Sequence, residues 1–137
     1  MTESEIMEAR KVFQDLLNLI SSAAEQFEYE ASVPIANVPA ELVCMWFDDH
    51  YYPNSEWFLE CFSPQERDTL AEFHRFYEAR VDALLDTEQV SELQKSTEWQ
   101  EVMAKAKEAA GEIEWATEQG AQACVSRGTS LIARPLG

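Results

Sequence analysis

Few side chains in this sequence have the type and spacing that metal binding requires. Asp48, Asp49 and His50 are consecutive, but neighbours on a helix point about 100° apart, so all three cannot converge on one ion. His74 and Glu78 are four residues apart, which would place them on one helix face where they could share an ion. Most pairs of that kind are surface hydrogen bonds, and neither histidine follows a glutamate at the three-residue spacing of di-iron bundles. We therefore expect no metal ion and no cofactor.

Catalytic groups are equally sparse. Cys61 could pair with His50 or His74 as nucleophile and base, but a buried cysteine is usually inert. Asp49 and Glu56 could act as an acid–base pair, yet among 26 acidic residues such pairs arise by chance. The sequence contains no glycine-rich phosphate loop, no nucleophile elbow, no zinc-protease motif and no EF-hand loop. We therefore expect a protein that is not an enzyme.

Aromatic and acidic residues alternate in the segment 46–58, and this pattern indicates a binding surface. Tryptophan and tyrosine dominate the hot spots of protein interfaces. A carboxylate beside an aromatic ring suits arginine, which forms an ion pair and stacks on the ring face. The aromatic residues of the segment are Trp46, Phe47, Tyr51, Tyr52, Trp57 and Phe58, and its acids are Asp48, Asp49 and Glu56.

Some of these rings belong to the core of any folded structure. We expect at least two of Trp46, Phe47 and Phe58 to be buried. The neighbouring Tyr51 and Tyr52 are harder to bury together, so we expect them at the surface beside the two aspartates. The alternative interpretation is that the segment is a core helix with a solvated acidic face.

The charge distribution indicates the same kind of partner. The formal net charge is −16 at pH 7, which repels nucleic acid phosphates and anionic membranes. From Val12 to Glu66 there is no lysine or arginine, so this stretch cannot neutralise its own field. A second acidic stripe recurs every four residues at Glu78, Asp82 and Asp86. We expect a basic protein as the partner, with no nucleic acid and no membrane. The carboxylates of the stretch without basic residues are Asp15, Glu25, Glu28, Glu30, Glu41, Asp48, Asp49, Glu56, Glu60 and Glu66.

Cysteine usage and the N-terminal sequence predict a cytoplasmic protein. Cys44, Cys61 and Cys124 are an odd number without CxxC spacing, and the first two lie among apolar residues, which favours buried free thiols. The acidic N-terminus leads into no apolar signal segment. The sequence contains no run of about 18 apolar residues, so it predicts no membrane span.

The elements that must position these residues are all predicted to be helices. Helical spacing of apolar residues predicts a helix over 3–28, opened by a capping box at Thr2 and Glu5, and a second over 39–50. The serine, proline and glutamate of 63–66 predict a helix to about Leu85, and a capping box at 97–100 opens a helix to about Thr117. We also expect a short helix over 55–62, before the helix that starts at 63–66, and a helical turn over 87–93, before the helix that starts at 97–100.

We therefore expect an all-α protein with one helical domain over residues 1–119, a bundle of about five antiparallel helices. A C-terminal tail over 120–137 follows, because this segment has no acid and contains glycine, small residues and two arginines. The predicted last turn of the first helix holds Glu25 and Glu28, where the helix dipole favours cations.

In size, charge and lack of catalytic motifs, the chain resembles the immunity proteins of bacterial toxin systems. The segment from Trp46-Phe47-Asp48-Asp49-His50-Tyr51-Tyr52-Pro53 to Phe62-Ser63-Pro64-Gln65-Glu66 looks like a family pattern. The resemblance implies a bacterial, cytoplasmic protein that blocks the active site of a basic, nuclease-like toxin with carboxylates that mimic phosphates. Association would be fast and sensitive to salt. The residues that we expect to bind the partner are Asp48, Asp49, Tyr51, Tyr52 and Glu56, with Glu78 and Asp82 as a second set.

A second hypothesis is a helical adaptor or structural subunit. It would hold a partner helix in an apolar groove lined by Trp57, Trp99 and Trp115. Salt separates the two hypotheses, because screening weakens an acidic interface and leaves an apolar groove unaffected or strengthened. The identity of the partner, the stoichiometry and the oligomeric state stay open.

Overall fold

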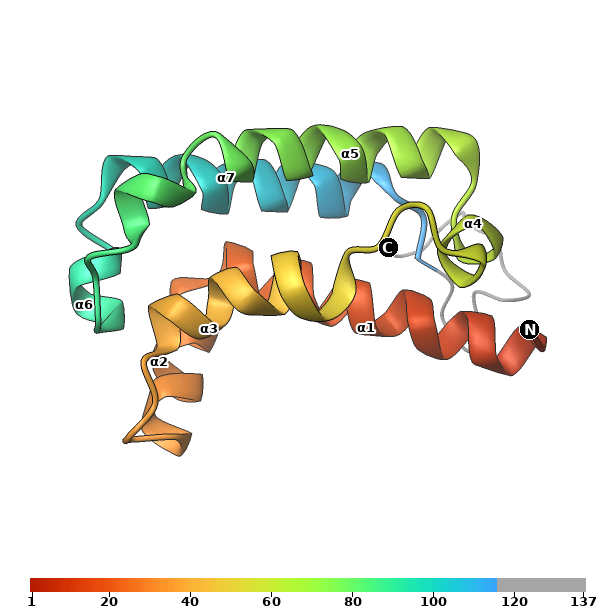
Figure 1. Ribbon diagram of the computed structural model, residues 1–137. Coiled ribbons are helices and arrows are strands. Elements are labelled where there is room, and N and C mark those ends of the chain that lie inside the picture. Colours follow the sequence, from red (N-terminus) through yellow and green to blue (C-terminus); the bar gives the residue numbers. More distant parts are fainter. Residues whose placement is uncertain (116–137) are drawn as a thin grey trace, which may run out of the picture.

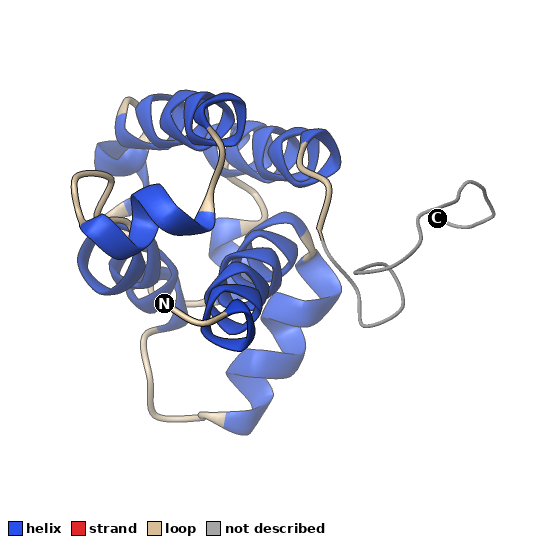
Figure 2. Cartoon of the chain, turned by 90° about the vertical axis from the view of Figure 1, so that its right-hand side faces the viewer, coloured by secondary structure: helices blue, strands red, loops and turns tan. Residues whose placement is uncertain are grey.

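The computed structural model describes residues 1–115 and confirms the all-α class, because this part of the chain has helices and no strand (Figure 1, Figure 2). The predicted tail, residues 120–137, lies outside the described residues. None of the helices within residues 1–115 is both long and apolar enough to cross a membrane. The elements are α1 (Glu3–Ser21), α2 (Ala23–Ser32), α3 (Val38–Cys44), the π-helix η1 (Met45–His50), α4 (Glu56–Cys61), α5 (Pro64–Glu78), the 3₁₀-helix η2 (Val81–Leu84), α6 (Val90–Leu93) and α7 (Thr97–Glu112).

Three long helices form the centre of the molecule. α7 packs against both α1 and α5 and runs in the direction opposite to both (Figure 1). Each helix turns one apolar stripe inward, as the periodicity of its sequence predicts. The buried residues of these stripes are Phe13, Leu16, Leu17 and Ile20 in α1, Leu70, Phe73 and Tyr77 in α5, and Trp99, Val102, Ala106 and Ala109 in α7.

The predicted helix over 3–28 is two helices, and the prediction of one continuous element is wrong. The chain breaks at Ser22, whose backbone is extended and whose hydroxyl accepts a hydrogen bond from the Glu25 amide at 3.2 Å. Serine competes with helical hydrogen bonding in this way and so favours caps over helix interiors. Glu25 therefore lies in the first turn of α2, where a negative charge is favourable, and not in the last turn of α1.

Gln26 stabilises this break from inside the core. Its side chain is fully buried, and its amide nitrogen donates to the carbonyls of Leu19 and Ile20 at 2.9 Å each. Both carbonyls belong to the last turn of α1, where the regular helical donors end, and the Leu19 carbonyl also accepts from the Ser22 amide at 3.4 Å. The amide oxygen accepts from the Trp99 indole N–H at 3.1 Å and from the Gln94 side chain. One polar residue thus connects the end of α1 with α7.

The other helix boundaries follow capping chemistry. The capping boxes predicted at Thr2–Glu5 and Ser63–Glu66 are both present. The box predicted at the start of α7 is displaced, because the cap is Ser96, whose hydroxyl accepts from the Trp99 amide.

The helix predicted to continue to Leu85 ends at Glu78. Arg80 folds back there, donating to the Phe76 carbonyl at 3.1 Å and to Glu101 at 2.9 Å. A cation at the C-terminal end of a helix is favourable, and it satisfies a carbonyl that lacks a helical donor. The chain then continues as η2, which buries Leu84.

Candidate partner-binding surface

The acidic and aromatic segment lies on the π-helix η1. In a π-helix the hydrogen bonds join residues five apart, here from the Tyr51 amide to the Trp46 carbonyl at 3.1 Å. Trp46 and Tyr51 therefore face the same way, and their rings stack with centroids 4.9 Å apart. Asp48 and Asp49, which lie between them in sequence, are both exposed. The π geometry thus buries two aromatic rings and leaves two adjacent carboxylates on the outside.

His74 of α5 holds both ends of η1. Its Nδ1 accepts a hydrogen bond from the Trp46 indole N–H at 3.1 Å. Its ring stacks on Tyr51, with centroids 4.6 Å apart and planes inclined by 27°, and lies 5.2 Å from the Phe47 ring. Trp46 is fully buried, so this contact lies at the edge of the core. A histidine from another helix therefore helps to position the acidic segment.

Burial lowers the pKa of His74 below its usual value. The carboxylate of Glu78 opposes this shift and the charge of Arg75 adds to it. The Nε2 atom lies 3.9 Å from the Glu78 carboxylate, which is 64% exposed, so this pair contributes little to stability. The shift favours the neutral imidazole, which is the form that accepts the indole hydrogen bond.

The field around Cys44, at the end of α3, is negative. Partial burial raises the pKa of the Cys44 thiol, and a hydrogen bond to Asp48 and the charges of Asp49 and Glu41 raise it further. Cys44 is exposed, which contradicts the prediction that it is buried, because it lies on the outward face of α3. Its thiol nevertheless stays protonated and is a poor nucleophile.

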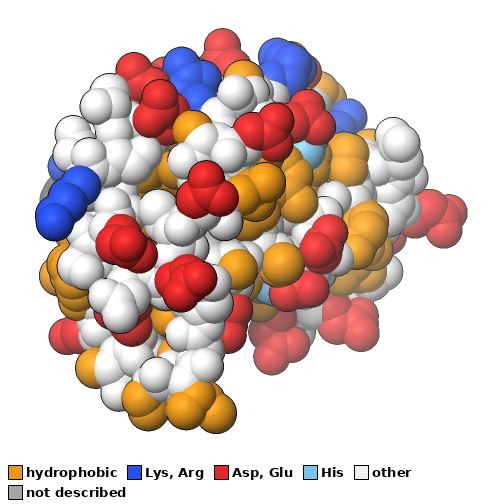
Figure 3. Space-filling model, turned by 60° about the vertical axis from the view of Figure 1, so that its left-hand side comes forward, with side chains coloured by type: hydrophobic (Ala, Val, Ile, Leu, Met, Phe, Trp, Pro, Cys, Tyr) orange, Lys and Arg blue, Asp and Glu red, His pale blue; other side chains and the backbone are white. Residues whose placement is uncertain are grey.

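Among residues 1–115, Asp48 and Asp49 form no ion pair. None of the ion pairs within residues 1–115 involves either side chain, whereas Arg10 and Lys105 pair with carboxylates elsewhere. On the side of the molecule that carries α3 and α6, acidic side chains surround apolar ones (Figure 3). Two adjacent carboxylates that form no ion pair within residues 1–115, at the edge of an aromatic cluster, make a surface to which a cationic side chain can bind.

The predicted site residues divide between this surface and other places. Asp48, Asp49 and Tyr52 lie on or next to η1 and are exposed, and the Tyr52 hydroxyl donates to the Asp48 carbonyl. Tyr51 is only 8% exposed, so its prediction as a surface anchor is wrong. The structure buries it because the π-helix turns it onto Trp46.

The remaining predicted acids are exposed but differ in their relation to η1. Glu78 lies beside His74, and the His74 ring in turn stacks on Tyr51 at the end of η1. Glu56 begins α4, and Asp82 lies in η2 and not in a long helix as predicted. Within residues 1–115, no hydrogen bond or ion pair joins Glu56 or Asp82 to Asp48. We name the group Glu41, Cys44, Asp48, Asp49 and Tyr52 the η1 surface.

The sequence did contain a signal for the part of the η1 surface that we did not predict. Glu41, Cys44 and Asp48 are spaced three and four apart, which is the spacing of one helix face. Glu41 also accepts a hydrogen bond from the Tyr29 hydroxyl at 2.6 Å, which links α2 to this face. The role of His74 had no such signal, because it depends on contacts between separate helices.

The prediction for the other aromatic residues of the segment is confirmed. Trp46 and Phe58 are buried, and Phe47 is half-buried against Tyr77 and His74. They contribute to the core beside the acids of η1.

The apolar groove of the second hypothesis does not form with the predicted residues. Trp99 is fully buried and donates to Gln26, so it cannot line a surface groove. Trp115 is half-buried, with its indole N–H on the Ala110 carbonyl and the Arg10 guanidinium over its ring. These tryptophans stabilise the fold.

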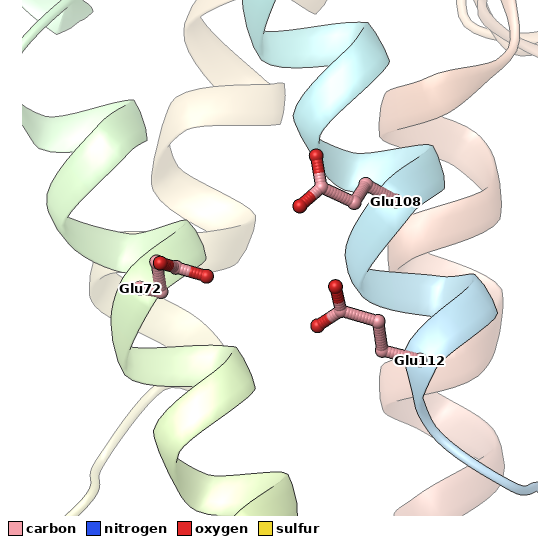
Figure 4. A group of neighbouring side chains, drawn as sticks. All are labelled: Glu72, Glu108 and Glu112. Atoms are coloured by element: carbon pink, nitrogen blue, oxygen red, sulfur yellow. The ribbon is translucent and has the colours of Figure 1, made fainter.

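Two further groups of side chains have the residue types that catalysis or metal binding requires. The Cys61 thiol is buried against the Met1 sulfur at 3.9 Å, and burial raises its pKa, so it is a poor nucleophile. Glu72 of α5 and Glu108 and Glu112 of α7 come within 4.8 Å of one another (Figure 4). Lys105 lies 3.6 Å from Glu72 and 3.2 Å from Glu108, so a cation of the chain already compensates this exposed group.

Fold and site together define an all-α protein with an acidic surface on and next to a π-helix. No protein-family model matches the sequence, and no curated protein or solved structure is significantly similar to it.

Proposed function

We propose that this protein is an acidic binding protein that neutralises a basic protein partner by covering its cationic surface. The observation that carries the proposal is the pair Asp48 and Asp49, exposed and without a counterion among residues 1–115, on a π-helix whose aromatic residues are fixed in the core. The stretch of 55 residues around the pair, from Val12 to Glu66, has no lysine or arginine to compete for these carboxylates.

The geometry favours arginine as the residue that is bound. Tyr52 offers a ring that is 49% exposed next to Asp48, so a guanidinium can pair with the carboxylate and stack on the ring. π-Helices are rare and occur frequently at functional sites. Because η1 is held by Trp46, Tyr51 and His74, its acids are ordered before binding, and less entropy is lost when the partner docks.

The kind of protein that fits best is an immunity protein. In this interpretation the chain acts in the bacterial cytoplasm and blocks the active site of a basic, nuclease-like toxin. Its net charge of −16 would attract such a domain over a distance and make the association rate depend on ionic strength. A nuclease site is built to bind phosphates, so paired carboxylates compete for the same cationic groups.

Charge reversal tests the proposal. The chain is used as bait in a lysate of its native host, washed at low and then at high salt, and the retained proteins are identified by mass spectrometry. We expect one basic protein that high salt releases, and we expect Asp48→Lys/Asp49→Lys to reduce its affinity by at least about tenfold. Unchanged affinity in this variant contradicts the proposal.

The matched control is Glu3→Lys/Glu8→Lys. Both residues are exposed on the first turns of α1, and the variant changes the net charge by the same amount. We expect it to slow association slightly and to leave the dissociation rate unchanged, because it acts only on the long-range field. Equal losses in both variants would show that total charge, and not the η1 surface, determines binding.

The adaptor hypothesis predicts the opposite salt dependence. Several large apolar side chains are exposed, among them Phe27 at 45% and Ile35 at 100%. A partner that survives the high-salt wash would indicate an apolar contact through such residues.

A further inference from the structure

We propose that His74 makes the η1 surface sensitive to pH, so that protonation of its imidazole loosens η1 and weakens binding of a cationic partner. This inference rests on the proposed function, because it concerns regulation of the same surface. The contacts that carry it are the Trp46 hydrogen bond and the Tyr51 stack, which tie both ends of η1 to this one ring.

The hydrogen bond between Trp46 and His74 permits only one protonation state of the imidazole. An indole N–H can only donate, so the Nδ1 atom of His74 must be the acceptor and the neutral ring carries its proton on Nε2. Protonation adds a hydrogen to Nδ1 and places two donors opposite each other. The Trp46 N–H would then lie without an acceptor next to a fully buried ring, which is unfavourable. Trp46 and η1 must therefore shift when His74 becomes charged.

The groups that face the imidazole do not compensate for this loss. Glu78, one turn along α5, would attract the charged ring, but the atoms are 3.9 Å apart and Glu78 is 64% exposed. Arg75 repels the charged form, and η1 and the loop after it present the rings of Phe47 and Tyr51. Burial is the largest influence and lowers the pKa of His74. Neutral His74 is therefore the form that stabilises η1.

Protonation also acts directly on the field of the η1 surface. A positive imidazole under η1 reduces the negative potential that attracts a cationic partner. The structural and the electrostatic effect have the same sign, so binding weakens as the pH falls. The change is linked to one proton, and the affinity falls by up to about tenfold per pH unit below the pKa of His74.

The second histidine is a natural control because its hydrogen bond does not depend on protonation. The Nδ1 atom of His50 lies 2.7 Å from the Met45 carbonyl, to which it can only donate. Both the neutral and the charged ring can donate this bond. The hydrogen bond of His50 to the Met45 carbonyl is therefore available to both forms of the ring.

The first measurement uses the free protein. Proton–nitrogen NMR spectra are recorded from about pH 7.5 to about pH 5, because the pKa of His74 lies below the usual histidine value and ordinary carboxylates stay mostly charged over this range. We expect the Trp46 indole N–H resonance to follow the titration of the His74 ring with the same midpoint. An indole resonance that stays constant while His74 titrates overturns the proposal, and this result does not depend on any variant being folded.

The second measurement uses an oligoarginine peptide as the probe, at low salt and over the same pH range. We expect its affinity to fall with pH for the wild type and for His50→Asn. It should fall less for His74→Asn, because the Asn amide oxygen can take the place of Nδ1 and does not titrate. An equal fall in His74→Asn overturns the proposal. A peptide that fails to bind at pH 7.5 contradicts the proposed function, whereas salt-sensitive binding without a pH step contradicts only the inference about His74.

Discussion

Arg10 shows how the few cations of this chain are used. Its guanidinium forms two hydrogen bonds to Glu66, at 2.8 and 3.0 Å, and donates to the carbonyls of Cys61 and Glu114. It also lies over the rings of Phe62 and Trp115. The side chains of the ion pair are only 14% and 18% exposed, so this pair is better ordered than a surface salt bridge. Arg10 thus joins α1 to the start of α5 and to the segment after α7.

Replacing Arg10 should reveal this connection as a pH-dependent loss of stability. Burial by itself raises the pKa of Glu66, but the bonds from Arg10 and Ser63 outweigh it and hold the pKa below its usual value of 4.5. The pair therefore adds stability above about pH 4.5 that is lost as the pH falls through the lowered pKa. We expect Arg10→Ala to reduce the free energy of unfolding by about 2 kcal/mol at neutral pH and by less in acid.

Urea unfolding at several pH values measures this effect. Arg10→Lys is the informative companion, because lysine keeps the charge but cannot form the two-pronged contact or stack on both rings. A loss that is the same at every pH would show that Arg10 acts through packing alone.

At the level of elements, the sequence predicted the helices well where a boundary is local. The capping boxes at Thr2 and Ser63 are short patterns whose atoms lie within one turn, so sequence alone is sufficient. The break at Ser22 and the end of α5 at Glu78 were missed, because Gln26 and Arg80 stabilise them through contacts with α7. Tertiary contacts override local periodicity at such points.

The same distinction explains the candidate site. The acids and rings of 46–58 are visible in the sequence, but which rings are buried depends on the π-helix and on His74. Tyr51 was therefore predicted at the surface although it stacks on Trp46.

The contribution of Gln26 to the α1–α2 break can be measured directly. Gln26→Leu keeps the volume of the side chain but removes the amide donor to the carbonyls of Leu19 and Ile20 and the acceptor of the Trp99 indole N–H. We expect the free energy of unfolding to fall by about 3 kcal/mol. Urea unfolding with an unchanged m-value checks this, with exposed Gln65→Leu as the control. A loss below about 0.5 kcal/mol would show that the break does not depend on the amide.

For the whole molecule, the balance of charge opposes folding and favours association. A net charge of −16 in 15.6 kDa produces self-repulsion in the compact state. Arg10, Arg80 and Lys105 pair with carboxylates of α5 and α7, and none of these three pairs lies on η1. Salt screens this negative field. It should therefore raise the free energy of unfolding of the free protein and lower its affinity for a basic partner.

The acids of η1 should for this reason reduce stability in the free protein. We expect Asp48→Asn/Asp49→Asn to raise the free energy of unfolding by about 0.5 kcal/mol at low salt, because it removes two charges from the field of Glu41 and of each other. The gain should shrink at high salt, while binding of the basic partner is lost.

Neutralising a paired acid in Glu66→Gln must act in the opposite direction, because Arg10 would lose its partner. Urea unfolding of both variants at low and high salt decides the question. If the η1 variant is less stable than the wild type, its acids serve the fold, and the strongest support for a partner-binding role is gone. If it is more stable and no longer binds, these residues reduce stability in favour of function, as residues of binding sites commonly do.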